Sequence, residues 1–295
     1  MKRAGFANTW LPILLLIPQL SIVAIFFYWP ALEAVQSSFF LQDPFGFGST
    51  FVGFENYADL FGSAEYRKVA WFTVIFTLLV TFLSLAIALL LAVKADTILR
   101  GAKTYRTLLM WVYAVAPPVA GFIGVIMFNQ TWGPLTNLAG LVGWDFVLGV
   151  KFNDTAFAMV LVSVWKQVPV NFIFFLSGLQ SFPKSVREAA LIDNRSASGR
   201  FWDITFPLLA PTGFFLLITN ITYALFDTFG VVDTLVKGEP GNNPMTLVYK
   251  VYVDGFRGND LGGSSAQSVI LMVLVLVLAL TVFQFRLVER RIHYT

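Results

Sequence analysis

The sequence predicts an all-helical membrane protein with six transmembrane helices. Apolar residues make up 57% of its 295 residues, charged residues only 13%, and the mean hydropathy is +0.73. This composition lies outside the range of soluble domains. Six stretches are also long and apolar enough to cross about 30 Å of hydrocarbon as helices of roughly 20 residues. These stretches are residues 11–29, 69–93, 108–128, 155–179, 206–226 and 268–285.

Residues 131–150 form another apolar stretch, which we do not count as a span. Gly133, Pro134 and Asp145 are among the residues that interrupt it, and such residues end helices. The first span follows Met-Lys-Arg as the core of a signal peptide would. It is long for such a core and has no small-residue cleavage site, so we expect it to be retained as a helix.

The distribution of charge orients the six spans. The N-terminus, the loops 94–107 and 180–205 and the tail from 286 together carry 13 Lys and Arg against 5 acidic residues. The other three loops carry 6 against 12. The positive-inside rule therefore predicts that both termini and the loop 180–205 are cytoplasmic. No repeat or long linker divides the chain, so we expect residues 1–295 to form a single transmembrane domain.

Patterns of catalytic and metal-binding residues are missing from the sequence. There is no cysteine and one histidine, which excludes thiolate chemistry, disulfides and a histidine cluster for metal. There is no phosphate-binding loop and no hydrolase motif, so we expect no enzymatic activity, no ATP hydrolysis and no cofactor in this chain. Five of the six spans carry no charged residue, which disfavours a proton- or sodium-coupled carrier. The energy source is therefore expected in another protein.

The charged segment 183–211, between the fourth and fifth spans, has the chemistry of a protein-binding loop. Glu188 falls in the first turn of a short helix, where a carboxylate complements the helix dipole. Ala189 and Ala190 favour that helix and leave a bare surface that another protein can approach closely. The Asp193-Asn194 pair ends the helix, because Asn tolerates the left-handed conformation. The alternative is an ordinary solvated loop with one amphipathic turn.

This segment resembles the EAA loop of the membrane subunits of bacterial ATP-binding-cassette (ABC) importers. The family pattern is E-A-A-x-x-D-G, followed by a proline where the chain re-enters the membrane. The resemblance implies a type I ABC importer permease fold, in which coupling helices sit in a cleft of an ATPase subunit. Asn194 stands where the family has glycine and can adopt the same turn at some energetic cost. The implied ATPase-coupling residues are Glu188, Ala189, Ala190, Asp193, Asn194 and Pro207.

The resemblance covers nearly the whole chain and narrows to the carbohydrate-type permeases, through Phe51-Val-Gly-Phe54, Trp165-Lys-Gln167 and Gly238-x-Pro240. The motif Tyr223-Ala-Leu-Phe-Asp227 is most similar to permeases for sn-glycerol 3-phosphate. The resemblance thus implies import of sn-glycerol 3-phosphate, or a related glycerophosphodiester, across a bacterial inner membrane by alternating access. The alternatives are a permease for another sugar or polyol and an ATP-independent channel or carrier.

The resemblance also implies partners. They are a second, different permease subunit that completes a heterodimer, two copies of an ATPase that binds ATP and Mg²⁺, and a periplasmic substrate-binding protein. The apolar spans imply membrane lipid around the chain. A net charge of +3 is too small to suggest nucleic acid.

Lys166 is the one charged residue within the six spans. Near the middle of a bilayer a charge costs at least about 2.5 kcal/mol, so it must face protein or water. Gln167 and Asn171 are four residues apart and share a helix face, and Pro169 opens the backbone between them. We expect Lys166, Gln167 and Asn171 to line the substrate pathway, with Lys166 attracting the phosphate. The alternative is that Lys166 neutralises a carboxylate such as Asp227 or contacts backbone.

Two polar residues of the fifth span, Asn220 and Tyr223, are further candidates for the substrate pathway. Their alternative role is to hold helices together, which is the commoner use of polar groups in membrane helices.

Overall fold

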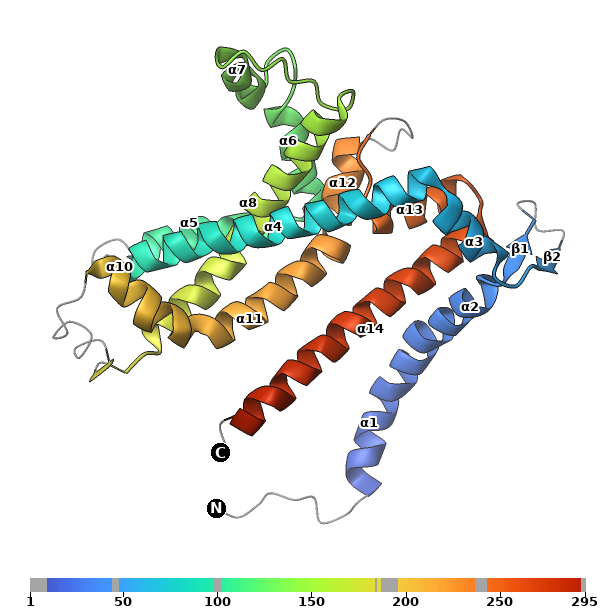
Figure 1. The fold of residues 1–295 in the computed structure, drawn as a ribbon, viewed down its shortest axis with the longest axis horizontal. Helices are drawn as coiled ribbons and strands as arrows, with labels where there is room; N and C mark the ends of the chain where they lie inside the picture. The colour runs from blue at the N-terminus through green and yellow to red at the C-terminus, as the bar shows by residue number, and fades with distance from the viewer. Residues whose placement is uncertain are drawn as a thin grey trace. The chain divides into compact units, whose positions relative to one another are not determined.

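A computed structural model describes residues 10–43, 48–97, 102–183, 185–186, 196–236 and 243–292. The described chain is mostly helical, as predicted (Figure 1). It forms two compact units. We call Met1–Tyr66 with Lys250–Thr295 the terminal unit, and Arg67–Tyr249 the central unit.

Two long helical segments build the terminal unit. The first consists of α1 (Trp10–Val23), the one-turn π-helix η1 (Ala24–Tyr28) and α2 (Trp29–Ser37). It therefore continues beyond the predicted end at residue 29. The second segment is α14 (Leu261–Ile292), which contacts α2.

Small elements connect these helices. The strands β1 (Phe40–Gln42) and β2 (Ser49–Phe51) form an antiparallel hairpin in which Phe40 faces Phe51. This hairpin departs from the all-helical prediction, because strands of three residues are too short to show an alternating pattern. The helix α3 (Glu55–Gly62) follows, and the side chain of Asn56 donates hydrogen bonds to the carbonyls of Ser38 at 2.8 Å and Phe40 at 3.2 Å.

The central unit contains most of α4 (Ala64–Thr97), together with α8 (Phe152–Gln180) and α11 (Phe206–Thr222). Each of the three extends slightly beyond its predicted span or belongs to a longer helical segment. Over the described residues, five helical segments are long and apolar enough to cross a membrane, and Pro117–Met127 is a shorter apolar helix. The five are Trp10–Ser37, Ala64–Asp96, Phe152–Gln180, Ser198–Asp227 and Leu261–Thr281.

The third predicted span, residues 108–128, is not one continuous helix. It is divided into α5 (Ala102–Ala114) and α6 (Pro117–Met127). Ala116 is extended, with ψ 145°, because a proline ring disfavours the helical conformation of the residue before it. Pro117 and Pro118 also have no N–H to continue the hydrogen bonds of α5. The two prolines therefore interrupt the helix within the predicted third span.

Close packing joins α6 to α12 (Phe229–Val236). A Cβ built on Gly230 would lie 2.9 Å from the ring of Pro118, and one built on Gly121 would lie 2.8 Å from Cβ of Thr234. Glycine at both positions allows the two backbones to approach, as small residues commonly do between membrane helices.

The remaining elements are short. The stretch 131–150 holds only one helix, α7 (Pro134–Leu141). The helix α10 (Ala197–Arg200) and the π-helix η2 (Phe201–Thr205) lead directly into α11, and the π-helix η3 (Tyr223–Asp227) follows it. The helix α13 (Leu247–Tyr252) and the π-helix η4 (Val253–Arg257) precede α14.

Within the central unit, α8 is the innermost helix. In its most apolar window 67% of the residues are buried, compared with none for Trp10–Ser37. It contacts α5, α6, α11 and α12, and Figure 1 shows α11 running beside it. Polar side chains on α8 must therefore be satisfied by other protein groups or by water.

Candidate functional site

The ammonium group of Lys166 lies in the interior of the central unit. Its side chain extends from α8, the residue is 8% exposed, and Nζ lies 5.9 Å from the centre of the Tyr113 ring on α5. A cation over an aromatic face at this distance is attracted to it. Across the described ranges, no ion pair or hydrogen bond involves Lys166, and in particular none joins it to Asp227. The ammonium group is thus left with hydrogen-bonding capacity.

Gln167 lies next to Lys166 on α8 and is 7% exposed. Its amide makes no hydrogen bond within the part of the chain that the structure describes. Two adjacent polar side chains of α8 therefore retain hydrogen-bonding capacity, which is the property that residues along a polar substrate pathway require.

Asn171 and Asn220 lie in a different environment, because they bind each other. Asn171 Nδ2 donates to Asn220 Oδ1 at 2.9 Å, and Asn220 Nδ2 donates to Asn171 Oδ1 at 2.7 Å. Ser84 of α4 completes the cluster, since its hydroxyl donates to Asn220 Oδ1 at 2.8 Å and accepts from Asn171 Nδ2 at 3.2 Å. All three residues are fully buried. The cluster joins α4, α8 and α11.

The hydrogen-bonding capacity of this cluster is nearly used up. The second amide proton of Asn220 goes to the carbonyl of Leu216 at 2.6 Å. Both amide groups therefore have partners for all their N–H bonds. Satisfied buried networks of this kind rigidify helix packing, so the geometry favours the helix-holding role of Asn171 and Asn220.

Tyr223 makes a third link between α8 and the α11 segment. It is 7% exposed, and its hydroxyl donates to the carbonyl of Ser163 at 3.2 Å. The structure thus brings Asn171, Asn220 and Tyr223 to one helix contact, whereas the side chains of Lys166 and Gln167 make no hydrogen bond with the residues that the structure describes.

Sequence reasoning did not single out the hydroxyl groups of α4. Thr73, Thr77, Thr81 and Ser84 follow one another at helical spacing and are all buried. The hydroxyls of Thr77 and Thr81 have no hydrogen-bond partner in the described structure. The spacing of three to four residues in an otherwise apolar span is the sequence signal that would have found this polar face.

The expected coupling residues Glu188, Ala189, Ala190, Asp193 and Asn194 lie outside the described residues. Pro207 is described and stands in the first turn of α11.

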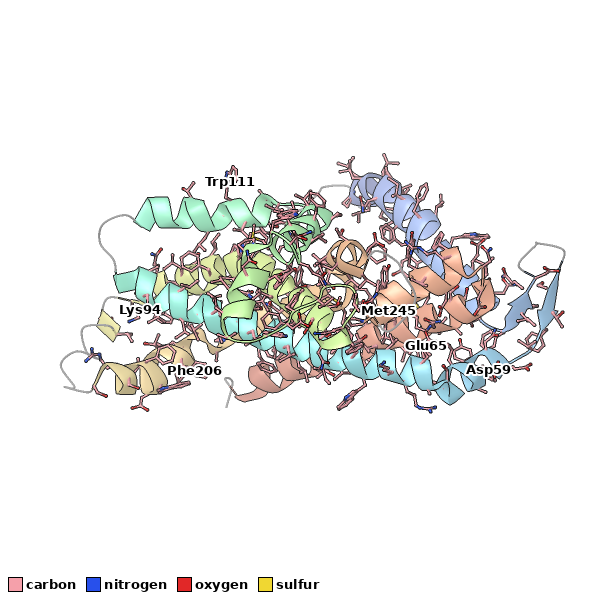
Figure 2. All side chains as sticks on the ribbon, turned by 90° about the horizontal axis from the view of Figure 1, so that it is seen from above. Asp59, Glu65, Lys94, Trp111, Phe206 and Met245 are labelled. Carbon is pink, nitrogen blue, oxygen red and sulfur yellow. The ribbon has the colours of Figure 1, made fainter. Side chains whose placement is uncertain are left out.

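An aromatic cluster lies where α11 begins. The rings of Trp202 and Phe206 are 5.2 Å apart, and Trp202 is 59% exposed. Figure 2 shows Phe206 at the same end of the central unit as Lys94, near the end of α4. Exposed rings therefore lie within the segment 183–211 that is expected to contact the ATPase.

Comparison with known proteins identifies the family. Residues 85–294 match the family described as binding-protein-dependent transport system inner membrane component. The chain is 48% identical to the sn-glycerol-3-phosphate transport system permease protein UgpA of Rhizobium meliloti (strain 1021), over 100% of both chains. It is 46% identical to the UgpA protein of Yersinia enterocolitica, over 99% of both chains. These matches confirm the predicted family resemblance.

Solved structures show the same fold. A bacterial ABC transporter involved in the import of the acidic polysaccharide alginate matches with a TM-score of 0.81 and 20% identity, over 94% of both chains. A second structure, of an alginate ABC transporter in complex with an alginate-bound periplasmic protein, matches with a TM-score of 0.80 and 19% identity, over 92% of both chains. The family match over residues 85–294 and the identities of 48% and 46% show that this chain belongs to the family of inner membrane components of binding-protein-dependent transport systems.

Proposed function

We propose that the chain is the membrane-spanning permease subunit of an ATP-driven importer of sn-glycerol 3-phosphate or a related glycerophosphodiester. The observation that supports this proposal is the 48% identity, over its full length, to permease proteins named for that transport system. The chain would work by alternating access in a bacterial inner membrane, as a single permease domain.

In this proposal the chain crosses the membrane six times, with both termini in the cytoplasm. Five long apolar helices account for five crossings. The sixth is made by α5 and α6 together, because α6 alone is shorter than the roughly 20 residues that a crossing requires. The loops assigned to the cytoplasm carry more Lys and Arg than acidic residues, and the other loops carry fewer, which supports this orientation.

The proposed substrate pathway contains Lys166 and Gln167. A buried ammonium group that forms no ion pair with a described carboxylate suits an anionic substrate, because a phosphate would supply the charge-assisted hydrogen bonds that it lacks. The neighbouring amide of Gln167 would bind glycerol hydroxyls. Asn171, Asn220 and Tyr223 would hold the pathway helices in place.

The proposed partners follow from the family, whose transport systems depend on a binding protein, and the absence of a phosphate-binding loop leaves ATP hydrolysis to another protein. Two copies of an ATPase would bind ATP and Mg²⁺, a second permease subunit would complete the pathway, and a periplasmic binding protein would deliver the ligand. Glu188, Ala189, Ala190, Asp193, Asn194 and Pro207 would form the contact with the ATPase.

Reconstitution tests this proposal. The complete complex with its binding protein is placed in liposomes, and ATP-dependent uptake of radiolabelled sn-glycerol 3-phosphate is compared with uptake of glycerol and maltose. We expect ATP-dependent uptake of the phosphate ester alone. Preference for a neutral sugar or polyol would identify a sugar permease instead. Uptake by the purified chain alone, without ATP, would show a channel or carrier.

A further inference from the structure

The two helices that flank the segment 183–205, α8 and α11, contact each other closely where they emerge from that segment. A Cβ built on Gly178 would lie 2.9 Å from Leu209 Cδ2 and 3.2 Å from Thr212 Oγ1. The bare backbone of Gly178 therefore lets α11 approach α8 at this end. Contacts through small residues are the usual way in which membrane helices pack closely.

Two further contacts follow along the same pair of helices. Asn171 pairs with Asn220, and beyond them the hydroxyl of Tyr223 binds the carbonyl of Ser163. Residue numbers fall along α8 as they rise along α11, which is the register of an antiparallel helical hairpin. At about 1.5 Å per residue, Asn171 lies roughly 10 Å from Gly178 along α8, and Ser163 lies roughly 12 Å further.

The hydrogen-bonded pair of Asn171 and Asn220 fixes the register of α8 against α11, which apolar packing does not do. Apolar helices in lipid gain little from one register over another, because lipid is as apolar as the neighbouring helix. Directional hydrogen bonds between buried amides do distinguish registers, as a single buried asparagine does in coiled coils. A slide of α8 against α11 would break both amide bonds and the bonds to Ser84 together.

The contact of Tyr223 also crosses the weakest point of α8. Pro169 lies between Asn171 and Lys166 and removes one backbone hydrogen bond of the helix. Ser163, which Tyr223 binds, lies on the far side of Pro169. The α11 segment therefore spans the proline and links both halves of α8.

We propose that Asn171 and Asn220, with Ser84, are positioning residues for transport. Their hydrogen bonds hold α8 and α11 together as one rigid unit. A displacement applied where α8 ends and α11 begins then moves the part of α8 that carries Lys166 by the same amount. Without these hydrogen bonds, α8 and α11 would slide against each other, and only part of that displacement would reach Lys166. This inference rests on the proposed importer function, because it needs a driven motion at the cytoplasmic ends.

The first test replaces both amides by leucine, which is close to asparagine in shape, in the complete complex in liposomes. The measured quantity is the number of ATP molecules hydrolysed per substrate imported. For N171L/N220L we expect the binding protein still to stimulate ATP hydrolysis. We expect the number of ATP molecules hydrolysed per imported substrate to rise at least about fivefold, because typical coupling between two sites changes an equilibrium by about fivefold or more. A matched control is T222V, since among the described residues the Thr222 hydroxyl binds the Ile218 carbonyl of its own helix alone. An unchanged number in an assembled N171L/N220L complex would overturn the proposal.

The second test uses the absence of cysteine from this chain. N171C/N220C is assembled with cysteine-free partner subunits and bridged with a short bifunctional thiol reagent. We expect poor coupling before bridging, near wild-type coupling after it, and equal bridging yield in nucleotide-free and vanadate-trapped complexes. Uptake that is lost on bridging, or bridging in only one of the two nucleotide states, would show that the two helices separate during transport. Either result would overturn the proposal. This test decides the matter if N171L/N220L fails to assemble. A wild-type complex that imports nothing would instead overturn the proposed function.

Discussion

The Lys166 ammonium lies 5.9 Å from the centre of the Tyr113 ring, and it forms no ion pair with a described carboxylate, although the charge of Asp227 acts on it from a greater distance. The two residues come from different helices, α8 and α5. An aromatic face attracts a cation without neutralising it. The pair therefore holds a positive charge inside the central unit in a form that an anion can still bind.

This arrangement makes the charge of Lys166 a determinant of substrate affinity. We expect Lys166→Gln to raise the substrate concentration for half-maximal uptake about 10- to 100-fold, because a hydrogen bond to a charged group contributes about 1.5–3 kcal/mol. Lys166→Arg keeps the charge and is expected to lose less. The measurement is uptake by the reconstituted complex over a range of substrate concentrations. Unchanged uptake of the anion by Lys166→Gln would remove Lys166 from the pathway.

The coupling segment is tested by reversing one charge. We expect Glu188→Lys to abolish uptake and leave insertion of the chain into the membrane intact, because it reverses the charge on the expected ATPase-docking surface. Glu188→Asp, which keeps the charge, serves as the control. Uptake and the amount of ATPase that copurifies with the chain are both measured. Full uptake by the charge-reversed complex would contradict the coupling role.

The amide pair predicts a non-additive effect on stability. Asn171→Leu leaves the buried amide of Asn220 without one partner, at a cost of about 1–3 kcal/mol in the free energy of unfolding. The double variant with Asn220→Leu should be less destabilised than the sum of the two single variants, because it leaves no amide unpaired. Unfolding in lipid nanodiscs measures all three variants. Additive losses would mean that the pair contributes no coupling energy.

A buried lysine of the terminal unit predicts a dependence on alkaline pH. Lys250 Nζ lies 3.0 Å from Glu65 Oε1 and 3.1 Å from Asp254. Burial lowers the pKa of Lys250 and is the largest single effect, but the hydrogen bonds and charges of the two acids together raise the pKa above its ordinary value of 10.5. A raised pKa means that the folded state favours the charged lysine. The resulting stability is complete below pH 10.5 and is lost as pH rises through the folded-state pKa.

We therefore expect the difference in stability between wild type and Lys250→Met to stay constant from neutral pH to near 10.5 and to shrink above it. Unfolding measured over a pH series checks this. Lys151→Met is the control, because its ion pair with Asp145 is exposed to solvent and such pairs contribute little. A difference that disappears between pH 7 and 9 would show that Lys250 is not stabilised as a cation.

Much of the fold follows from the sequence, because long apolar windows identify membrane helices by themselves. Pro117 and Pro118 indicate a kink in the third span, but the average hydropathy of a window does not show that the helix is interrupted there, at Ala116. The windows also gave no sign of the hairpin at Phe40 and Phe51, where pairing depends on contacts between separate segments.

The sequence predicted several polar residues of the site, but it did not predict the contacts between them. Lys166 stands out because it is a charge in an apolar span, and Asn171 and Asn220 stand out as polar residues. Their pairing, and the part of Ser84, depend on how three helices are rotated about their axes, which a single sequence does not specify. Polar spacing along one helix identifies a face but not its partner.

The break between α5 and α6 leaves two backbone carbonyls of the proposed third crossing without their usual helical partners. The carbonyls of Tyr113 and Ala114 would bind the N–H groups of residues 117 and 118 in a continuous helix, but both of those residues are proline. Carbonyls without partners are not tolerated against hydrocarbon. In such a crossing these two oxygens need water or another protein group as a donor, and one of them belongs to Tyr113, whose ring centre lies 5.9 Å from Lys166 Nζ.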